Sequence, residues 1–439
     1  MTLVETPYWW DHAKPLPDLP PAPPQRVELL IVGAGFTGLS AAIHAARAGA
    51  QVCVVDAGLP GQGASTRNGG MAGAHPRLSL KDTAAIWGMD TAQALFNEAE
   101  PAFDHLQTLM DDFAIDCDYQ LTGRVQLAWT RADAIRQESM AADMAEGTNF
   151  SVEFVPRDRL GSHINTDQYF GALYYPTHAG LHPRKLYDGM LNAALSLGVT
   201  IVPHCPIWDI TRQGASFTAR HSGGTIAADK VILATNGYTQ GRGILAWAKR
   251  RVFPLPSYII ATEELSPNLI ADLAPGRRMM VETRARHSYF RISPDGRRIL
   301  WGGRASMTPI SAERAAARLR SSLEQIWPRL KGVRLTHSWT GNTGFAFEQA
   351  AHVGTHDGIH FAMGYCGGGV VLAPYLGMKA AFQALGDPRG ETAYSRTALS
   401  TRAWHPGGKP YFMHGANFWY GQVVDRRQLR EAARDHLSG

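Results

Sequence analysis

Short apolar runs, each closed by a glycine turn or a polar segment, mark buried strands near the start of the chain. Val27–Val32 and Gln51–Asp56 are two such runs. Residues 33–48, which lie between them, combine a glycine turn with an alanine-rich segment of helical periodicity. A strand, a tight glycine turn, a helix and a second strand within about 30 residues are typical of a βαβ unit. We therefore predict a βαβ unit here.

Helical and strand patterns alternate in the next part of the chain. Residues 80–150 have mostly helical spacing, with one strand candidate at Leu121–Trp129. The segment His182–Leu197 predicts a helix, because Pro183 suits the first helical position and apolar residues recur with helical period. Three further apolar runs predict strands at Val199–Val202, Pro206–Ile210 and Lys230–Thr235.

Strand patterns dominate from Phe253 to Gly303. The clearest is a hairpin in which Ser288–Ile292 and Arg298–Trp301 flank a turn at Pro294-Asp295-Gly296. Residues 311–330 return to helical periodicity. This distribution predicts a region built on a mainly antiparallel sheet.

The two ends of the chain carry weaker signals. Tyr8, Trp9 and Trp10 suggest an arm that packs on the protein's own surface, and Pro15 to Pro24 predicts a stiff, extended linker. A glycine-rich turn at Gly364–Gly369 precedes a helix to about Leu385, and the tail from Gly386 has few periodic signals.

Composition narrows the class of protein. A chain of 439 residues exceeds one compact core and predicts two domains, or three. The net charge of +5 is spread along the chain without any Lys/Arg-rich run, so we expect no nucleic-acid partner. A mildly positive pocket for an anionic cofactor or substrate fits this balance better.

The cysteines favour a reducing compartment. Cys53, Cys117, Cys205 and Cys366 are far apart and form no CxxC or Cys/His metal spacing. We expect a cytoplasmic protein without disulfides or a metal site. The N-terminus lacks the pattern of a signal peptide. The most apolar stretch, Leu29 to Val55, is too interrupted for a membrane span.

A nucleotide fingerprint lies inside the predicted βαβ unit. In Gly33-Ala34-Gly35-Phe36-Thr37-Gly38, the first glycine allows the tight turn, the second allows close approach of a pyrophosphate, and the third allows close packing of helix and strand. Free N–H groups at the helix N-terminus favour phosphate. Asp56 closes the second strand, 23 residues after Gly33, where a carboxylate can accept both ribose hydroxyls.

Three later segments extend this site. Gly63–Gly70 is a second glycine-rich segment, in which Ser65, Arg67 and Asn68 supply hydrogen-bond donors. Ala234-Thr235-Asn236-Gly237 ends a buried strand, and the glycine turn near residue 366 can stabilise negative charge on a reduced flavin. The predicted cofactor-binding residues are Gly33, Gly35, Phe36, Thr37, Gly38, Asp56, Ala57, Ala64, Ser65, Arg67, Asn68, Gly69, Gly70, Ile207, Ala234, Thr235, Asn236, Gly364, Gly367, Gly368, Gly369 and Val370.

These motifs occur in a recognisable order: GxGxxG, GASTRNGG, VILATNGYT, YFRISPDGRRILWGGR and GYCGGGV. Together they resemble the D-amino-acid oxidase/glycine oxidase superfamily of FAD enzymes over roughly residues 25–390. The nearest resemblance is to the γ-glutamylputrescine oxidase-like branch, which favours GASGRNGG. The resemblance implies FAD as cofactor and an α/β fold, in which a discontinuous Rossmann-like FAD-binding domain is interleaved with an α+β substrate domain on a mainly antiparallel sheet.

Domain boundaries follow from this resemblance. The arm and linker take residues 1–24, and a C-terminal extension takes residues 391–439. We expect the FAD-binding domain at residues 25–100, 164–245 and 337–390, and the substrate domain at residues 101–163 and 246–336.

Departures from the family pattern bear on how FAD is held. Some relatives tether FAD through a His in the segment matching Arg67-Asn68, and others through a Cys in the segment matching Trp339–Phe345; neither is present here. The resemblance therefore implies non-covalent FAD, with His75 as the remaining candidate for a tether.

A second departure bears on the substrate. Gly367 stands where glycine oxidase-like members carry an Arg that grips the substrate carboxylate, which favours an amine recognised elsewhere. Four arginines remain as alternative carboxylate clamps, although each is more often structural or solvated: Arg284, Arg286, Arg291 and Arg304.

The implied reaction is hydride transfer from the carbon beside a neutral amine to the flavin, and hydrolysis of the imine to an aldehyde or keto acid. Electrons then pass to O₂, giving H₂O₂, or to another acceptor. Such chemistry requires a dry pocket, and we take His287, Tyr289 and Trp339 as pocket residues, with Tyr258 as a further candidate. Core packing is the alternative role for each. Cys366 is either redox-active or a small buried residue.

Other functions remain open. A dehydrogenase that feeds a different acceptor has the same sequence pattern, and a non-catalytic FAD-binding subunit belongs to another class. A flavin monooxygenase commonly has a second nucleotide fingerprint, and this sequence has none. The sequence does not indicate the oligomeric state.

Overall fold

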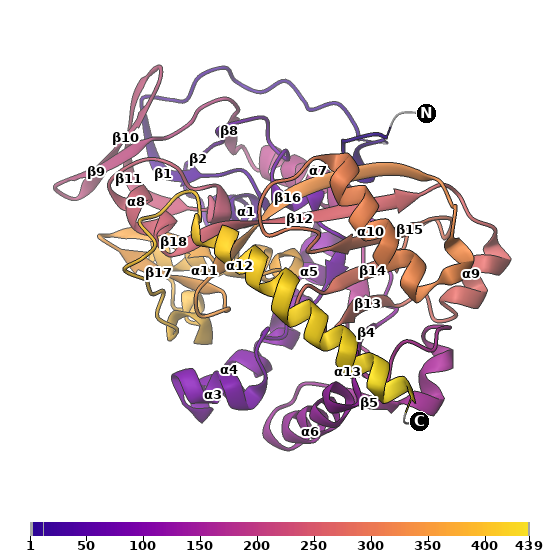
Figure 1. Ribbon diagram of the computed structural model, residues 1–439. Helices are drawn as coiled ribbons and strands as arrows, with labels where there is room; N and C mark the ends of the chain where they lie inside the picture. The colour runs from indigo at the N-terminus through magenta and orange to yellow at the C-terminus, as the bar shows by residue number, and fades with distance from the viewer. Residues whose placement is uncertain (1–2, 12, 438–439) are drawn as a thin grey trace.

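The computed structural model describes residues 3–11 and 13–437, and two eight-stranded sheets organise them (Figure 1). The first sheet has the order β17-β18-β11-β1-β2-β8, with β10 and β9 following from β11. Its strands from β18 to β8 are parallel, whereas β17, β10 and β9 pair in antiparallel fashion. The strands are β1 (Arg26–Val32), β2 (Val52–Val55), β8 (Thr200–Val202), β9 (Asp209–Gln213), β10 (Ser216–His221), β11 (Gly224–Leu233), β17 (His352–His356) and β18 (Ile359–Met363).

The second sheet has the order β16-β12-β15-β14-β13-β4-β6-β5, and only its β13–β4 pair is parallel. A small two-stranded sheet pairs β3 with β7. The strands are β3 (Met71–Ala72), β4 (Arg124–Leu127), β5 (Glu153–Pro156), β6 (Gly171–Tyr175), β7 (Ala179–Gly180), β12 (Val252–Thr262), β13 (Met279–Glu282), β14 (Ser288–Ile292), β15 (Ile299–Gly303) and β16 (Leu335–Ala346).

Helices pack around both sheets. Helix α1 contacts α11 and α7. The α-helices are α1 (Phe36–Arg47), α2 (Ala64–Arg67), α3 (Leu80–Trp87), α4 (Met89–Asn97), α5 (Ala99–Asp112), α6 (Arg131–Gly147), α7 (Pro183–Ser196), α8 (Ile244–Lys249), α9 (Pro267–Leu273), α10 (Ala312–Ile326), α11 (Gly369–Leu385), α12 (Phe412–Trp419) and α13 (Asp425–Leu437). Shorter turns of helix are η1 (Tyr8–Trp10), η2 (Arg157–Ser162), η3 (Asn236–Tyr238), η4 (Pro328–Leu330), η5 (Pro388–Gly390), η6 (Ala393–Ser395) and the π-turn η7 (Tyr420–Val424).

Separate hydrophobic cores support the two sheets. In the first, Leu29 and Ile31 of β1 join residues of α1, α5, α7 and α11. In the second, Phe290 stacks on Trp301 with ring centroids 4.0 Å apart, and Trp327 meets both rings edge-on. Such large buried aromatic surfaces fix the hairpin against α10.

Most predicted elements are present. The βαβ unit is β1, α1 and β2, with the two strands parallel, and the predicted hairpin is β14–β15. The expected α/β class, with mixed sheets, is confirmed. The strand predicted at Pro206–Ile210 is displaced, because regular pairing begins only at Asp209.

The C-terminal tail corrects the prediction of few elements. Helices α12 and α13 and the π-turn between them form one long helix across the molecule (Figure 1). This helix buries only Met413 and Ala432. The sequence therefore lacks the wide apolar stripe by which a helix is usually predicted.

The chain passes repeatedly between the sheets. Strands β4–β6 lie in the second sheet, β8–β11 in the first, β12–β16 in the second, and β17–β18 in the first. The predicted domain boundaries stay a prediction. Residues 164–245 and 337–390 were expected in the FAD-binding domain, yet β6 and most of β16, which lie in these ranges, pair in the second sheet. Periodicity identifies a strand without naming its partner, which explains the difference.

Two searches of the described residues bear on the remaining predictions. No helix among them has the length and apolar character that crossing a bilayer requires. Likewise, no cluster of three or more His, Cys, Asp or Glu side chains among these residues is placed to hold a metal ion.

Candidate cofactor and substrate site

The first glycine turn joins β1 to α1 in a conformation that only glycine suits. Gly33 has a φ of 108°, and a Cβ there would lie 2.8 Å from the carbonyl oxygen of Ala234 at the end of β11. A Cβ on Gly38 would overlap the carbonyl oxygen of Gly33. Gly35 supplies no capping side chain to α1, and Ser65 accepts from the N–H of Phe36, so a dinucleotide phosphate would use the N–H groups that follow Phe36.

Asp56 lies directly beside this turn. Its carboxylate accepts hydrogen bonds from the N–H of Ala34 at 2.8 Å and the N–H of Gly58 at 3.0 Å. Burial raises the pKa of the carboxyl, and these hydrogen bonds oppose that rise. The predicted neighbours Ala57 and Ile207 lie close by, and the Ile207 side chain belongs to the core cluster behind β2. The placement fits the predicted ribose contact.

The second glycine segment, residues 63–70, is held by its own side chains. It contains α2, and the Oγ of Ser65 accepts a hydrogen bond of 3.0 Å from the N–H of Phe36 in α1. Asn68 donates to the carbonyls of Ala64 and Ser65 at 3.1 and 2.9 Å and accepts from the N–H of Gly70 at 2.8 Å. The predicted donor Asn68 thus shapes the segment.

Three tryptophan indoles fasten the same segment from outside. Trp10 donates to the Oγ of Thr66 at 3.0 Å, Trp339 to the carbonyl of Arg67 at 3.0 Å, and Trp9 to the carbonyl of Asn68 at 2.7 Å. The Arg67 guanidinium lies 4.6 Å from the Trp10 ring. The aromatic arm, residues 8–10, therefore docks on the protein's own surface, as predicted.

The third and fourth segments meet one another. The Asn236 side chain accepts a 2.9 Å hydrogen bond from the N–H of Gly364, which ties the end of β11 to the late glycine segment, residues 364–369. Gly367 has a φ of 106° immediately before α11, whose first residues include the predicted Gly369 and Val370. The hydroxyls of Thr37 and Tyr365 lie 2.7 Å apart and join this segment to the first glycine turn.

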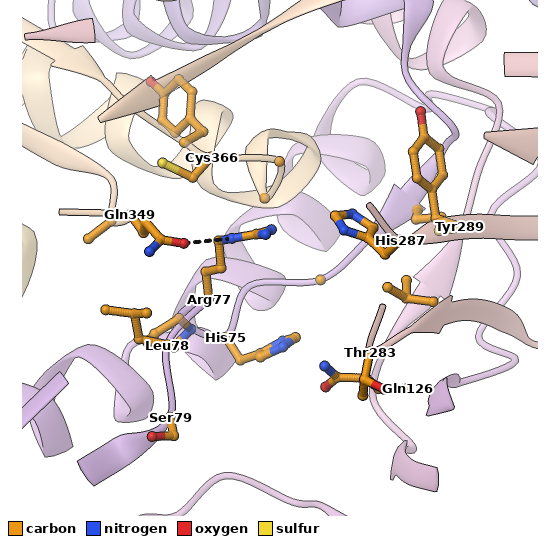
Figure 2. Close-up of a pocket in the computed structure, with 18 of the residues that line it drawn as sticks. His75, Arg77, Leu78, Ser79, Gln126, Thr283, His287, Tyr289, Gln349 and Cys366 are labelled. Carbon is orange, nitrogen blue, oxygen red and sulfur yellow. Dashed lines mark hydrogen bonds between the residues drawn. The ribbon is translucent and has the colours of Figure 1, made fainter. Parts of the chain in front are cut away.

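A cavity of about 1060 Å³ opens between the glycine segments and the second sheet. Ala64, Arg67, Asn68 and Gly69 line it on one side, together with residues 365–368 and Val370. His287 and Tyr289 line it as well (Figure 2). One cavity therefore brings together two predicted cofactor segments and two predicted pocket residues.

The two pocket residues have distinct surroundings. Burial and the charges of Arg77 and Arg304 lower the pKa of His287 well below its usual value, so its imidazole is neutral at neutral pH. The Tyr289 hydroxyl lies 2.9 Å from the Ser257 hydroxyl. The Tyr289 ring packs close to Gly69, where a Cβ would approach it to 3.1 Å.

Trp339 differs from its prediction. Its ring is buried with Trp9, Ile259 and Leu300, behind the second glycine segment, and it is not among the described residues that line the cavity. Successive side chains of β16 point to opposite faces of the sheet, but this alternation does not tell which of the two faces borders the cavity. Tyr258 is likewise in the core beneath the second sheet.

Three of the four candidate carboxylate clamps serve the fold. Arg284 bonds Glu282 at 2.7 Å, and Arg286 bonds Asp425 at 2.6 Å. Arg291 donates to the carbonyls of Gly70 and Leu181 at 2.6 and 2.9 Å, although its burial lowers its pKa to about 10. Only Arg304 lines the cavity without a carboxylate partner.

Sequence reasoning missed four further cations of the cavity, Arg77, Lys81, Arg124 and Arg136. Arg77 donates to the Gln349 side chain at 3.2 Å and faces His287 (Figure 2). Arg124 on β4 lies 2.8 Å from His75, whose ring stacks on Tyr175 with centroids 4.6 Å apart. Arg77 and Arg124 come from segments without a glycine or aromatic motif, so no local signal marked them.

Cys366 has the surroundings of an unreactive thiol. Its sulfur lies 3.1 Å from the carbonyl of Gly364 and accepts from the N–H of Ala346 at 3.4 Å. Burial raises its pKa to about 11. These contacts favour the packing role of the two that the sequence left open.

These residues fit FAD. The close approach at Gly33, the N-terminus of α1 and the carboxylate of Asp56 suit the adenosine and pyrophosphate, while the cavity between residues 64–69 and 365–370 has room for a flavin ring.

Comparison with known proteins agrees with this assignment. The family described as "FAD dependent oxidoreductase" matches residues 28–383. The probable oxidoreductase OrdL of Rhizobium meliloti is 29% identical over 385 residues, covering 86% of this chain and 88% of the relative. The gamma-glutamylputrescine oxidoreductase of Escherichia coli is 27% identical over 399 residues, covering 89% and 92%.

Among solved structures, glycine oxidase from Geobacillus kaustophilus superposes with a TM-score of 0.72 at 19% identity. The superposition covers 87% of this chain and 99% of that one. At this identity the likeness concerns the fold, and it confirms a glycine oxidase-like architecture.

Proposed function

The chain belongs to the DAO family of FAD dependent oxidoreductases, and from this membership we propose that it binds FAD non-covalently and oxidises a small amine or amino acid. The proposal includes the finer architecture, in which the first sheet forms a discontinuous Rossmann-like FAD-binding domain and the second sheet supports the substrate. The names of two relatives, gamma-glutamylputrescine oxidoreductase and glycine oxidase, favour this substrate class.

One observation carries the proposal: a single cavity is lined by the second and late glycine segments and by His287 and Tyr289 of the second sheet. A substrate in this cavity would lie between the flavin-binding segments and the sheet. Bound FAD supplies hydride acceptance from the carbon beside the amine nitrogen, and water then converts the imine to an aldehyde or keto acid.

The residues around the cavity favour this chemistry in two ways. The imidazole of His287 is neutral, so it adds no positive charge beside the substrate nitrogen. The Tyr289 ring packs close to Gly69 and adds apolar surface to that part of the cavity. Transfer of electrons to O₂, with H₂O₂ as product, is part of the proposal.

Anaerobic mixing of the purified yellow protein with candidate substrates tests the proposed reaction. We expect the visible flavin absorbance to bleach with one class among putrescine, γ-glutamylputrescine, N-methyl amines, sarcosine, glycine, and D- and L-amino acids. Admission of air then separates an oxidase, which re-oxidises rapidly, from a dehydrogenase. Absence of bleaching by every amine and amino acid would favour a non-catalytic FAD-binding subunit.

Acid precipitation tests the absence of a covalent tether. We expect the flavin in the supernatant. A yellow pellet would contradict this, and mass spectrometry of its peptides would then show whether His75, which lines the cavity, carries the flavin.

A further inference from the structure

The cavity carries positive charge that the protein does not neutralise. Arg77, Arg124 and Arg304 all line it, and none of the three forms an ion pair with a carboxylate of the described residues. We call them the cavity arginines. A guanidinium stays charged at neutral pH even here, because burial lowers the pKa of Arg304 only to about 10.

Two of these cations lie beside the same aromatic ring. Arg77 and Arg304 both approach the Phe345 ring, at 5.5 and 4.9 Å from its centroid. Each makes one hydrogen bond to the protein, Arg77 to the side chain of Gln349 and Arg304 to the carbonyl of Pro256 at 3.2 Å. These are the hydrogen bonds of the two side chains among the described residues, and both side chains line the cavity.

Arg124 forms a separate group with His75. Its guanidinium lies over the Tyr175 ring at 4.8 Å and contacts His75 at 2.8 Å. The Nε of Arg124 and the Nδ1 of His75 are buried and have no hydrogen-bond partner among the described residues. Buried polar atoms of this kind are costly unless a ligand satisfies them.

The carboxylates that line the cavity are already engaged. Glu282 pairs with Arg284, Asp143 pairs with Lys81 at 2.8 Å, and Asp82 accepts from Ser79 at 2.7 Å. None of them compensates the cavity arginines. An anionic ligand in the cavity would supply the charge that the lining carboxylates do not.

We propose that the substrate is an amine that carries two carboxylates, one bound by Arg124 with His75 and the other by Arg77 with Arg304. The inference rests on the proposed amine oxidation and narrows its substrate class. A single carboxylate would leave one group of cavity arginines without a carboxylate, and a second ammonium group would be repelled by both groups. Arginine binds carboxylates through paired N–H donors, which suits both positions.

Binding without turnover tests the inference. The holoenzyme is titrated with straight-chain dicarboxylates from malonate to adipate, each compared with the monocarboxylate of equal carbon number, and perturbation of the flavin spectrum reports binding. We expect at least one dicarboxylate to bind about tenfold or more tightly than its monocarboxylate, as one additional charge-assisted contact predicts. Equal affinities throughout the series would overturn the inference.

A pair of variants locates the second carboxylate. In Arg124→Gln we expect the preference for the dicarboxylate to fall to nearly one, with monocarboxylate affinity and FAD content retained. Arg157→Gln is the matched control, because Arg157 lies over Phe170 outside the cavity and also lacks a carboxylate partner. If Arg124→Gln instead loses FAD and keeps the preference, the cation serves the cofactor and the inference is wrong.

The outcomes separate this inference from the proposed function. If the protein binds dicarboxylates selectively but no amine bleaches its flavin, the proposed anion site stands and the proposed amine oxidation is wrong. Bleaching by amines without carboxylates, together with equal binding of mono- and dicarboxylates, would keep the oxidation and remove the anion site.

Discussion

The indole nitrogen of Trp9 donates a 2.7 Å hydrogen bond to the backbone carbonyl of Asn68, so the N-terminal arm is fastened to a segment that lines the candidate active site. Trp9 is fully buried, and its ring packs against His182 at 4.9 Å. A residue near the terminus thereby contributes to the rigidity of a loop about sixty positions later. We expect the arm to support the candidate cofactor site through Asn68.

Replacement of Trp9 by alanine tests this connection. We expect Trp9→Ala to lower the free energy of unfolding by about 3–5 kcal/mol, as for other buried aromatic residues, and to release FAD faster. Thermal melting and the flavin-to-protein absorbance ratio after gel filtration measure both effects. Trp404→Ala is the control, because Trp404 is 58% exposed. Unchanged FAD retention in Trp9→Ala would show that the arm does not support the site.

Asp56 is expected to be necessary for FAD. In Asp56→Ala the N–H groups of Ala34 and Gly58 lose their acceptor, at roughly 1–3 kcal/mol each, and the ribose contact is lost. The protein should purify with little flavin. Asp56→Asn keeps a carbonyl acceptor, so it should be more stable than Asp56→Ala. It should nevertheless bind FAD more weakly than wild type. Asp229→Ala, on a partly exposed carboxylate of the same sheet, is the control. Full occupancy in Asp56→Ala would remove Asp56 from the ribose role.

Cys366 is expected to be inert. With a thiol pKa of about 11, roughly one molecule in a thousand carries the thiolate at pH 8. Iodoacetamide should therefore label Cys366 slowly in the native protein and rapidly in denaturant, which peptide mass spectrometry resolves. Cys366→Ala should retain FAD and substrate bleaching. Rapid native labelling with loss of activity would instead assign the thiol a redox role.

Acid should destabilise the protein through its buried histidines. Burial lowers the pKa of His44 to about 3 and the pKa of His105 to about 4. The centroids of the two imidazole rings are 5.0 Å apart. The unfolded chain binds these protons near pH 6.5 and the folded protein does not. Stability is therefore complete above about pH 6.5 and declines towards pH 4, by up to about 1.4 kcal/mol per pH unit for each histidine.

Urea unfolding at a series of pH values measures this dependence. We expect His44→Leu to reduce the slope between pH 6.5 and 4, while His414→Leu, at an exposed position, leaves it unchanged. An identical slope in wild type and His44→Leu would contradict the assignment of acid sensitivity to His44.

The sequence predicted best where a motif is local. The turn at Gly33–Gly38 depends on its own backbone and immediate neighbours, and the structure gives it the expected shape. The hairpin β14–β15 follows from two alternating strands and one turn. In both cases the residues that determine the geometry lie within a few positions of each other.

The sequence failed where partners are distant. Arg77 and Arg124 become cavity residues only because the segment after β3 meets β4 of the second sheet. Trp339 was expected in the pocket, but the fold places it behind Arg67, where it accompanies Trp9. Sequence periodicity predicts neither placement, because the pairing of strands that are far apart in the sequence decides which face of the sheet a side chain occupies.

The alternation of the chain between two sheets has a consequence for biosynthesis. Strand β1 begins at Arg26, yet α11, which packs on α1, ends at Leu385. The ribosome must therefore release nearly the whole polypeptide before the nucleotide fold can close, and we expect loading of FAD to follow translation rather than accompany it. Until then the nascent chain exposes an incomplete apolar sheet, which makes it a natural client for chaperones.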